Sequence, residues 1–410
     1  MSQTDRDILR SLAARWREWA EQPVMAERAR AWTALHDLCG ERVMVLFETG
    51  LLEHYVTEDE LRCTDPANRG LEMHLRRTLR HVEEVGDDTV LEPYWTVGWQ
   101  TRGEGYGIDY TMTRSTDAEG GGQGYTYDHP IRTPEDLERL RPRAWTVDRE
   151  ATERARERMD ALFGDLLPVQ VKGPGCFVPA LTAEVFRLAG NDNLLMWPYD
   201  EPEAIHRLMR YLCDDRLAMY DWMEREGLLS LNTDSRYVGS GSPGFTSALP
   251  APGSKEPARL NDLWVWMESQ ETTMVSPDMF AEFFLPYMAE ICRRFGLVYY
   301  GCCEPIDDRW AQILAQVDNI RAVSVSPWND FRKAGELLGP DYVYSRKPKP
   351  APMSGATPDW DALREDIDDT LAGARGCNLE IVFRDVYRIS DRERLATWVQ
   401  MVRERSAAVA

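Results

Sequence analysis

The residues best suited to chemistry are two adjacent cysteines, Cys302 and Cys303, which are followed at once by Glu304 and Pro305. Two sulfur ligands beside a carboxylate are donors that zinc accepts in proteins. A second interpretation treats vicinal cysteines as small hydrophobic residues that fill space. We favour the metal site, because the Glu-Pro continuation predicts that the pair lies where a strand ends.

The stretch before the cysteines predicts how they are positioned. Leu297–Tyr300 is an unbroken apolar run, which is typical of a strand buried on both faces in a parallel sheet. Gly301 lets the backbone turn after this strand. In a β/α barrel the C-terminal strand ends carry the chemistry. Adjacent side chains of an ideal strand point to opposite faces, so Cys302 and Cys303 can bind one metal only if the chain turns at them.

Apolar runs alternate with amphipathic helical stretches along most of the chain, which indicates parallel β/α units. Neither a Gly-x-Gly-x-x-Gly motif nor a Walker lysine is present, which argues against the nucleotide-binding open sheets. The sequence therefore predicts an α/β fold with one domain over residues 1–410. That domain is a closed (β/α)8 TIM-type barrel with a helical N-terminal extension at 1–40 and a β-rich excursion at about 91–127. Strands are predicted at Arg42–Glu48, Leu166–Lys172, Leu228–Asn232, Leu263–Met267, Leu297–Tyr300, Ile320–Val325, Tyr342–Ser345 and Leu379–Arg384.

Composition excludes several classes of partner. The chain has 410 residues and a formal net charge of −21, which argues against affinity for nucleic acid or an anionic membrane. We find no apolar run near the ~18–20 residues that span a bilayer, and no signal-peptide pattern at the N-terminus. The eight cysteines show no regular spacing. These features predict a cytoplasmic enzyme with reduced cysteines.

A metal at the cysteine pair needs a third ligand. Asp385 follows the last predicted strand and should therefore lie at the same end of the barrel, where we expect it to complete the set with Cys302 and Cys303. Cys377 precedes that strand and is interpreted as structural. Glu304 is a candidate ligand or a group that orients a ligand, although a carboxylate here can also cap the next helix.

Further polar residues follow the predicted strands and are candidates for the same site. Lys347 and Lys349 lie in a stiff Arg-Lys-Pro-Lys-Pro segment and could meet a phosphate, sulfonate or carboxylate, or remain solvated surface charges. Glu304, Glu271 and Lys347 are the candidate catalytic residues. The candidates for binding substrate are Glu48, Lys172, Asn232, Glu268, Lys349 and His129, the last of which lies in a predicted active-site loop.

Several short motifs occur in a recognisable order. They are Tyr-Asp-His-Pro-Ile at 127–131, Thr-Pro-Glu-Asp-Leu at 133–137, Ser-Pro-Asp-Met-Phe at 276–280 and Phe-Leu-Pro-Tyr at 284–287, followed by the strands at 297–303 and from 379. With these motifs the chain resembles the uroporphyrinogen decarboxylase superfamily over roughly residues 40–405. It is most similar to the branch of zinc-dependent methylcobamide:thiol (coenzyme M) methyltransferases. The resemblance implies a distorted (β/α)8 barrel with its site at the C-terminal mouth.

The chain departs from both patterns of that superfamily. The methyltransferases carry His-x-Cys on the sixth strand, whereas here Tyr300-Gly301-Cys302 occupies that place and Cys303 is the candidate replacement for the histidine. The methyltransferases also carry a second cysteine near the end of the last strand. The equivalent position in this chain falls near Arg384-Asp385 and is not a cysteine. The Arg-rich N-terminal segment of the decarboxylases has no match after Pro23.

Three functions stay open. The resemblance implies a zinc-dependent methyl- or alkyltransferase that acts between a corrinoid or other activated donor and a small thiol, with the corrinoid carried by a partner protein. The second is a metal-independent decarboxylase or lyase for a carboxylate substrate, which would not need the cysteine pair. The third is a barrel without catalysis that binds a corrinoid or tetrapyrrole. The sequence does not identify the thiol or the methyl donor, and a homodimer is one assembly state that stays open.

Overall fold

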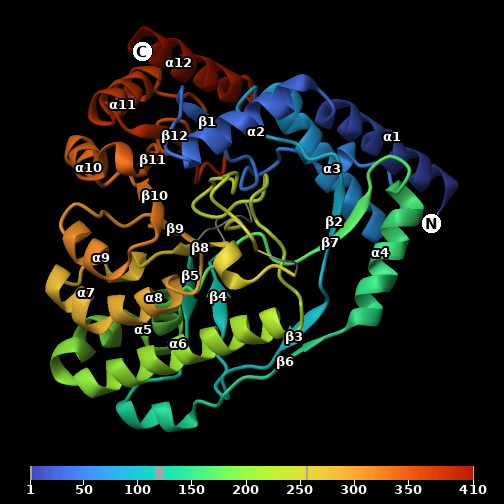
Figure 1. The fold of residues 1–410 in the computed structure, drawn as a ribbon. Coiled ribbons are helices and arrows are strands. Elements are labelled where there is room, and N and C mark those ends of the chain that lie inside the picture. Colours follow the sequence, from blue (N-terminus) through green and yellow to red (C-terminus); the bar gives the residue numbers. More distant parts are fainter. Residues whose placement is uncertain (1, 116–123, 255–256, 410) are drawn as a thin grey trace.

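A parallel sheet of six strands forms the centre of the computed structural model, which describes residues 2–115, 124–254 and 257–409. All of its strand pairs are parallel, in the order β1-β12-β11-β10-β9-β8. Figure 1 shows these strands along an arc with helices outside it. The chain is therefore mixed α/β, as predicted. The strands are β1 (Met44–Phe47), β8 (Trp264–Met267), β9 (Leu297–Tyr300), β10 (Ile320–Val325), β11 (Val343–Arg346) and β12 (Asn378–Phe383).

The predicted strand Leu166–Lys172 forms β7 (Val169–Lys172), which pairs in parallel with β2 (Trp95–Gly98) in a separate two-stranded sheet. The predicted strand Leu228–Asn232 is wrong, because this segment has no strand pairing. The Asn232 side chain does the bonding instead. Its amide donates to the carbonyls of Gly175 (2.9 Å) and Trp264 (3.1 Å), and its Oδ1 accepts from the Trp264 backbone N–H (3.0 Å). The hydrogen-bonded central sheet therefore ends at β1 and β8.

Helices lie outside the arc of strands, and helices also form the N-terminal part of the chain. The predicted N-terminal extension is helical, with α1 (Gln3–Ala20) and α2 (Pro23–His36). Within the described residues, no helix has both the length and the apolar content needed to cross a membrane. The remaining helices are α3 (Pro66–Glu84), α4 (Arg149–Phe163), α5 (Leu181–Asp200), α6 (Pro202–Arg225), α7 (Pro277–Phe283), α8 (Leu285–Cys292), α9 (Trp310–Gln316), α10 (Phe331–Leu338), α11 (Trp360–Gly373) and α12 (Glu393–Val409).

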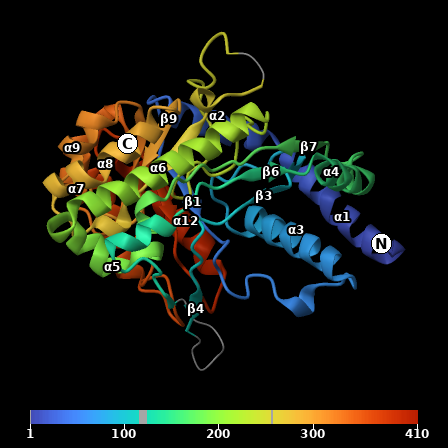
Figure 2. The same ribbon diagram turned by 90° about the horizontal axis from the view of Figure 1, so that it is seen from below.

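The predicted β-rich excursion at about 91–127 contains the four short strands β2 to β5, so the described residues show its β character; residues 116–123 lie outside them. Within it, β4 and β5 form an antiparallel pair, whereas β3 pairs in antiparallel with β6, which follows later in the chain. Figure 2 shows β4 projecting on the side opposite to the yellow loop that precedes β8. The bounds are β3 (Thr101–Gly103), β4 (Met112–Arg114), β5 (Tyr125–Tyr127) and β6 (Trp145–Val147).

Alternate residues of the sheet strands face two different cores. Val298 and Tyr300 of β9 belong to the large core that the outer helices share. Tyr299 belongs instead to a smaller core with Trp32 of α2 and Val382 of β12. Both faces of each strand are therefore buried, which explains why the strands read as continuous apolar runs.

The smaller core, which we call the inner core, includes a Gly-rich loop from Val238 to Gly244. Gly239 lies flat against Tyr299: a Cβ at this position would stand 2.1 Å from the ring carbon Cγ. Gly241 has a φ of +86° and lies against Val382. Larger residues cannot occupy these two positions without moving the loop or the strands.

Gly239→Ala should therefore destabilise the protein. An extra methyl group in a packed core costs about 1–3 kcal/mol, and we expect at least that loss in the free energy of unfolding, measured by urea denaturation. Gly50→Ala is the matched control, because its Cβ would meet nothing within 4 Å. Equal stability of the two variants would contradict the close packing of the loop.

Candidate active site at the cysteine pair

The chain turns sharply after β9 and brings the two thiols together. Gly301 has a φ of +90°, and the next three residues form a bend. The Sγ atoms of Cys302 and Cys303 lie 3.8 Å apart, so the turn that a shared ligand requires is present. Cys302 is half-buried and Cys303 is exposed. One thiol donates to the other, which lowers the pKa of Cys303 and raises that of Cys302.

A buried carboxylate fixes this turn. Glu304 is fully buried, and its two oxygens accept from the backbone N–H groups of Ser269 (2.8 Å) and Cys302 (2.9 Å). It therefore ties the loop after β8 to the loop after β9. Burial raises its pKa. Glu304 caps no helix, since α9 begins only at Trp310, and we interpret it as the residue that positions the cysteine pair.

Two more carboxylates from the end of β8 lie beside the pair. Glu268 is only 5% exposed, and burial, followed by the negative charges of Glu271 and Glu304, raises its pKa well above the ordinary value. Glu271 accepts a hydrogen bond from the Thr182 hydroxyl at 2.7 Å. These surroundings shift Glu268 toward its protonated form.

Lys347 lies buried in a polar layer of the inner core. Its Nζ donates to the Ser345 hydroxyl at 2.5 Å, and the hydroxyls of Ser345 and Ser242 both donate to Glu380. Burial lowers the pKa of Lys347 to about 7, although the charges of Glu380 and Cys302 act in the opposite direction. Lys347 is thus an amine that can gain or lose a proton near neutral pH.

Arg384 connects the end of β12 to Cys302. It forms an ion pair with Glu48 (3.0 Å) and donates to the Ser240 hydroxyl (2.5 Å), whose oxygen lies 3.9 Å from the Cys302 sulfur. Asp385 has a φ of +61°, and its charge partly opposes the lowering of the Cys303 pKa that the hydrogen bond with Cys302 causes. Glu48 and Asp385 therefore lie in the neighbourhood that the sequence predicts.

The other predicted site residues lie elsewhere or serve the fold. Lys172 forms an ion pair with Asp234 (3.0 Å) at the end of β7. Asn232 replaces strand pairing, as described above. His129 bonds to the Arg187 carbonyl through Nδ1 (3.2 Å), and its ring packs against Phe186. Lys349 is exposed and its charge acts on Asp366 of α11, in agreement with a surface lysine.

Three residues of the site were not predicted. Ser240 lies in a loop whose path the sequence does not define, and Arg384 was assigned to a strand without a role. Glu380 carried a usable signal, because it is a charged residue in the middle of an otherwise apolar strand. Such a residue is rarely buried without a partner.

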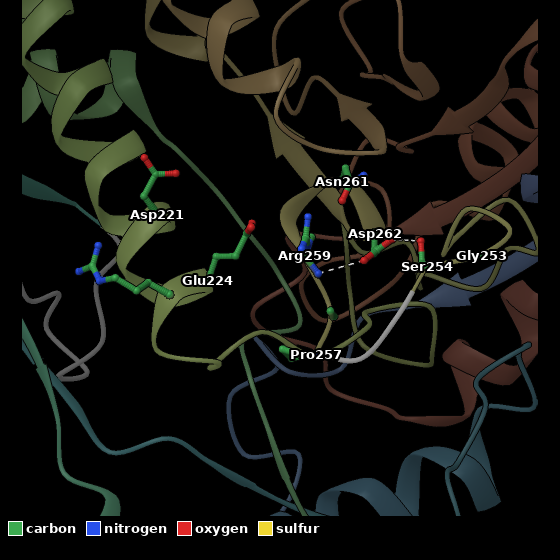
Figure 3. A pocket seen from close by; sticks show the side chains of 10 residues that line it. Asp221, Glu224, Gly253, Ser254, Pro257, Arg259, Asn261 and Asp262 are labelled. Atoms are coloured by element: carbon green, nitrogen blue, oxygen red, sulfur yellow. Dashed lines mark hydrogen bonds between the residues drawn. The ribbon is translucent and has the colours of Figure 1, made fainter.

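A cavity of about 610 Å³ opens onto Cys303. Glu271 also lines it, together with aromatic residues of which Tyr125 and Trp328 are 54% and 70% exposed. A small molecule can therefore reach Cys303 from solvent. A second cavity, of about 670 Å³, is shown in Figure 3. It lies between α6 and the residues just before β8, at the opposite end of that strand from the cysteine pair, and no predicted site residue lines it.

The cysteine pair fits two corners of a zinc tetrahedron. With zinc–sulfur bonds of about 2.3 Å, two sulfurs of a tetrahedral site are about 3.8 Å apart, and the two Sγ atoms here lie at 3.8 Å. Within the described residues, no group of three or more His, Cys, Asp and Glu side chains is close enough together to hold a metal. The third ligand, Asp385, therefore stays a prediction.

Comparisons with known proteins add little about activity. No family model matches the chain, and no curated protein matches it. Among solved structures, a methyltransferase from Methanosarcina mazei aligns over 92% of this chain and 97% of its own, with a TM-score of 0.49 and 12% identity. At that distance the function has to be argued from the site itself.

Glu268→Gln should change how stability depends on pH. Because the pKa of Glu268 is raised in the folded protein, the unfolded chain loses this proton first as the pH rises, so the wild type loses stability between the ordinary carboxyl pKa and the raised one. The glutamine variant should lack this loss. It should therefore gain stability relative to the wild type as the pH rises, in urea unfolding from pH 4 to pH 8.

Glu282→Gln, on the exposed part of α7, is the control and should follow the wild type. Parallel stability curves for wild type and Glu268→Gln would show that Glu268 ionises as it does in the unfolded chain.

Proposed function

We propose that the site around Cys302 and Cys303 transfers a methyl or other alkyl group from an activated donor to a small thiol, with zinc held by the pair. The observation that carries this proposal is the 3.8 Å separation of the two Sγ atoms at the open end of a cavity. Zinc bound there would lower the pKa of a substrate thiol and hold it as a thiolate. Asp385 is the proposed third ligand. A corrinoid on a partner protein is the proposed donor.

Three side chains around the cysteine pair have proposed roles in positioning the cysteines, accepting a proton and orienting the donor. Glu304 keeps both cysteines in the turn through its two backbone hydrogen bonds. Lys347 can take the proton that an incoming thiol releases, because its amine titrates near neutral pH and lies close enough to Cys302 to feel its charge. Glu271 lines the cavity beside Cys303 and can orient the donor.

The same proposal includes a ring of strands that closes as a (β/α)8 barrel. Between the two ends of the central sheet lie β2, β7 and the segment Leu228–Asn232. Hydrogen bonds link some of these parts: Gly173, just after β7, donates to the Ser230 hydroxyl (3.0 Å), and Asn232 donates to the Trp264 carbonyl of β8 (3.1 Å) and accepts from the Trp264 backbone N–H (3.0 Å). Such links support a distorted ring in which side chains replace part of the ladder.

Cys302→Ser and Cys303→Ser should each lose zinc and activity. Loss of groups that merely support a ligand costs 10–100-fold, so removal of a ligand should lower metal affinity by about 100-fold or more. Zinc is measured by elemental analysis of protein purified without chelator, and activity by methylation of a small thiol with methylcobalamin as donor. Both variants should unfold like the wild type, because neither cysteine fills a core.

Cys39→Ser provides the control, since Cys39 is the other exposed cysteine and lies at the end of α2. Wild-type protein without stoichiometric zinc, combined with full activity of both serine variants, would refute the proposal. A metal-independent decarboxylase or lyase would then be the better interpretation.

Lys347→Met should lower kcat by about 10²–10⁴-fold, the usual contribution of a positioned acid or base. The wild-type rate should rise as the pH increases through about 7, where Lys347 loses its proton, and this limb should be missing in the variant. Lys333→Met, on the exposed face of α10, should keep the wild-type profile. An unchanged pH–rate profile in Lys347→Met would exclude Lys347 as the base.

A further inference from the structure

We infer that Cys302 and Cys303 are also a redox modification site, at which a small disulfide converts the two thiols into a vicinal disulfide. This inference concerns regulation of the same site, and its consequence for activity rests on the proposed function. The oxidation itself depends only on the two cysteines and their access to solvent.

The geometry favours bond formation between the two sulfurs. Their separation is 3.8 Å, and a disulfide bond is about 2.0 Å long, so the atoms must approach by roughly 1.8 Å. The bend after Gly301 already points both side chains to one side. Cys63, Cys213 and Cys292 are buried, which shields them from a soluble oxidant.

Different exposure gives the two cysteines different roles. Cys303 is exposed and lines the cavity of about 610 Å³, so a small disulfide can reach its sulfur. Cys302 is half-buried behind it, in contact with Cys303 and 3.9 Å from the Ser240 hydroxyl. Cys303 is thus the thiol that attacks a small disulfide from solvent, and Cys302 is the thiol that then attacks the resulting mixed disulfide.

The reaction balances as two successive exchanges. The Cys303 thiolate attacks one sulfur of the small disulfide, breaks its S–S bond and releases one thiolate. The Cys302 sulfur then attacks the Cys303 sulfur of the mixed disulfide and releases the second thiolate. The two protons of the protein thiols end on the two released thiols. The protein pair is oxidised by two electrons, and the small disulfide is reduced by two.

Strain makes this disulfide easy to reduce. Neighbouring Cα atoms are about 3.8 Å apart, which is shorter than the span of an ordinary disulfide, so the bond is strained. Strained and exposed disulfides are the labile ones. Oxidation would remove both thiolates and so prevent zinc binding.

The test uses full-length protein treated with chelator and then with oxidised glutathione, in parallel with a zinc-loaded sample. Free thiols are blocked afterwards, and the peptide that contains residues 302 and 303 is examined by mass spectrometry. We expect the wild-type peptide to lose two blockable thiols, to retain no glutathione, and to recover both thiols with dithiothreitol. Zinc should slow the reaction. Cys302→Ser should instead keep one glutathione on Cys303, and Cys39→Ser should behave like the wild type.

Two outcomes would overturn the inference. In one, the wild-type peptide retains glutathione on Cys303 just as Cys302→Ser does. In the other, both thiols stay blockable under conditions in which exposed Cys39 takes up glutathione. Neither readout needs substrate or bound metal. Failure here would therefore leave the zinc and activity measurements untouched, and absence of zinc would not affect the oxidation assay.

Discussion

The candidate site depends on one buried carboxylate that joins two strand ends. Glu304 has no exposed surface, and a carboxylate in such a place is costly unless hydrogen bonds satisfy it. The two backbone N–H groups that it accepts come from the loops after neighbouring strands β8 and β9. Glu304 thus fixes the backbone path that brings the two sulfurs close together. The thiol pair is a consequence of this backbone geometry rather than of contacts between the cysteines alone.

The inner core is partly polar. Lys347 and Glu380 are both buried, and the Ser345 hydroxyl stands between them. The second oxygen of Glu380 and Nε2 of His36 lie 3.9 Å apart, and neither has a hydrogen-bond partner among the described residues. Glu380 and Cys302 both act on the pKa of Lys347, so Lys347 connects the inner core electrostatically to the site.

Local patterns in the sequence were sufficient for seven of the eight predicted strands and for the turn at the cysteine pair. Predominantly apolar runs predicted β9, β10 and β12 closely, because those strands are buried on both faces. Leu228–Asn232 resembles these strands in sequence, but the Asn232 side-chain amide forms hydrogen bonds in place of strand pairing. No local sequence pattern predicts this replacement. Ser240 and Arg384 were missed for a related reason: their contact joins residues 144 positions apart.

The position of α2 has a consequence for how the chain is divided. Trp32 and Leu35 of this helix are fully buried in the inner core beside Trp264 and Val382 of the sheet strands. A domain boundary drawn near residue 40 would therefore cut through a shared interior. A shortened chain that begins at the first strand would lose these two side chains and expose part of the inner core.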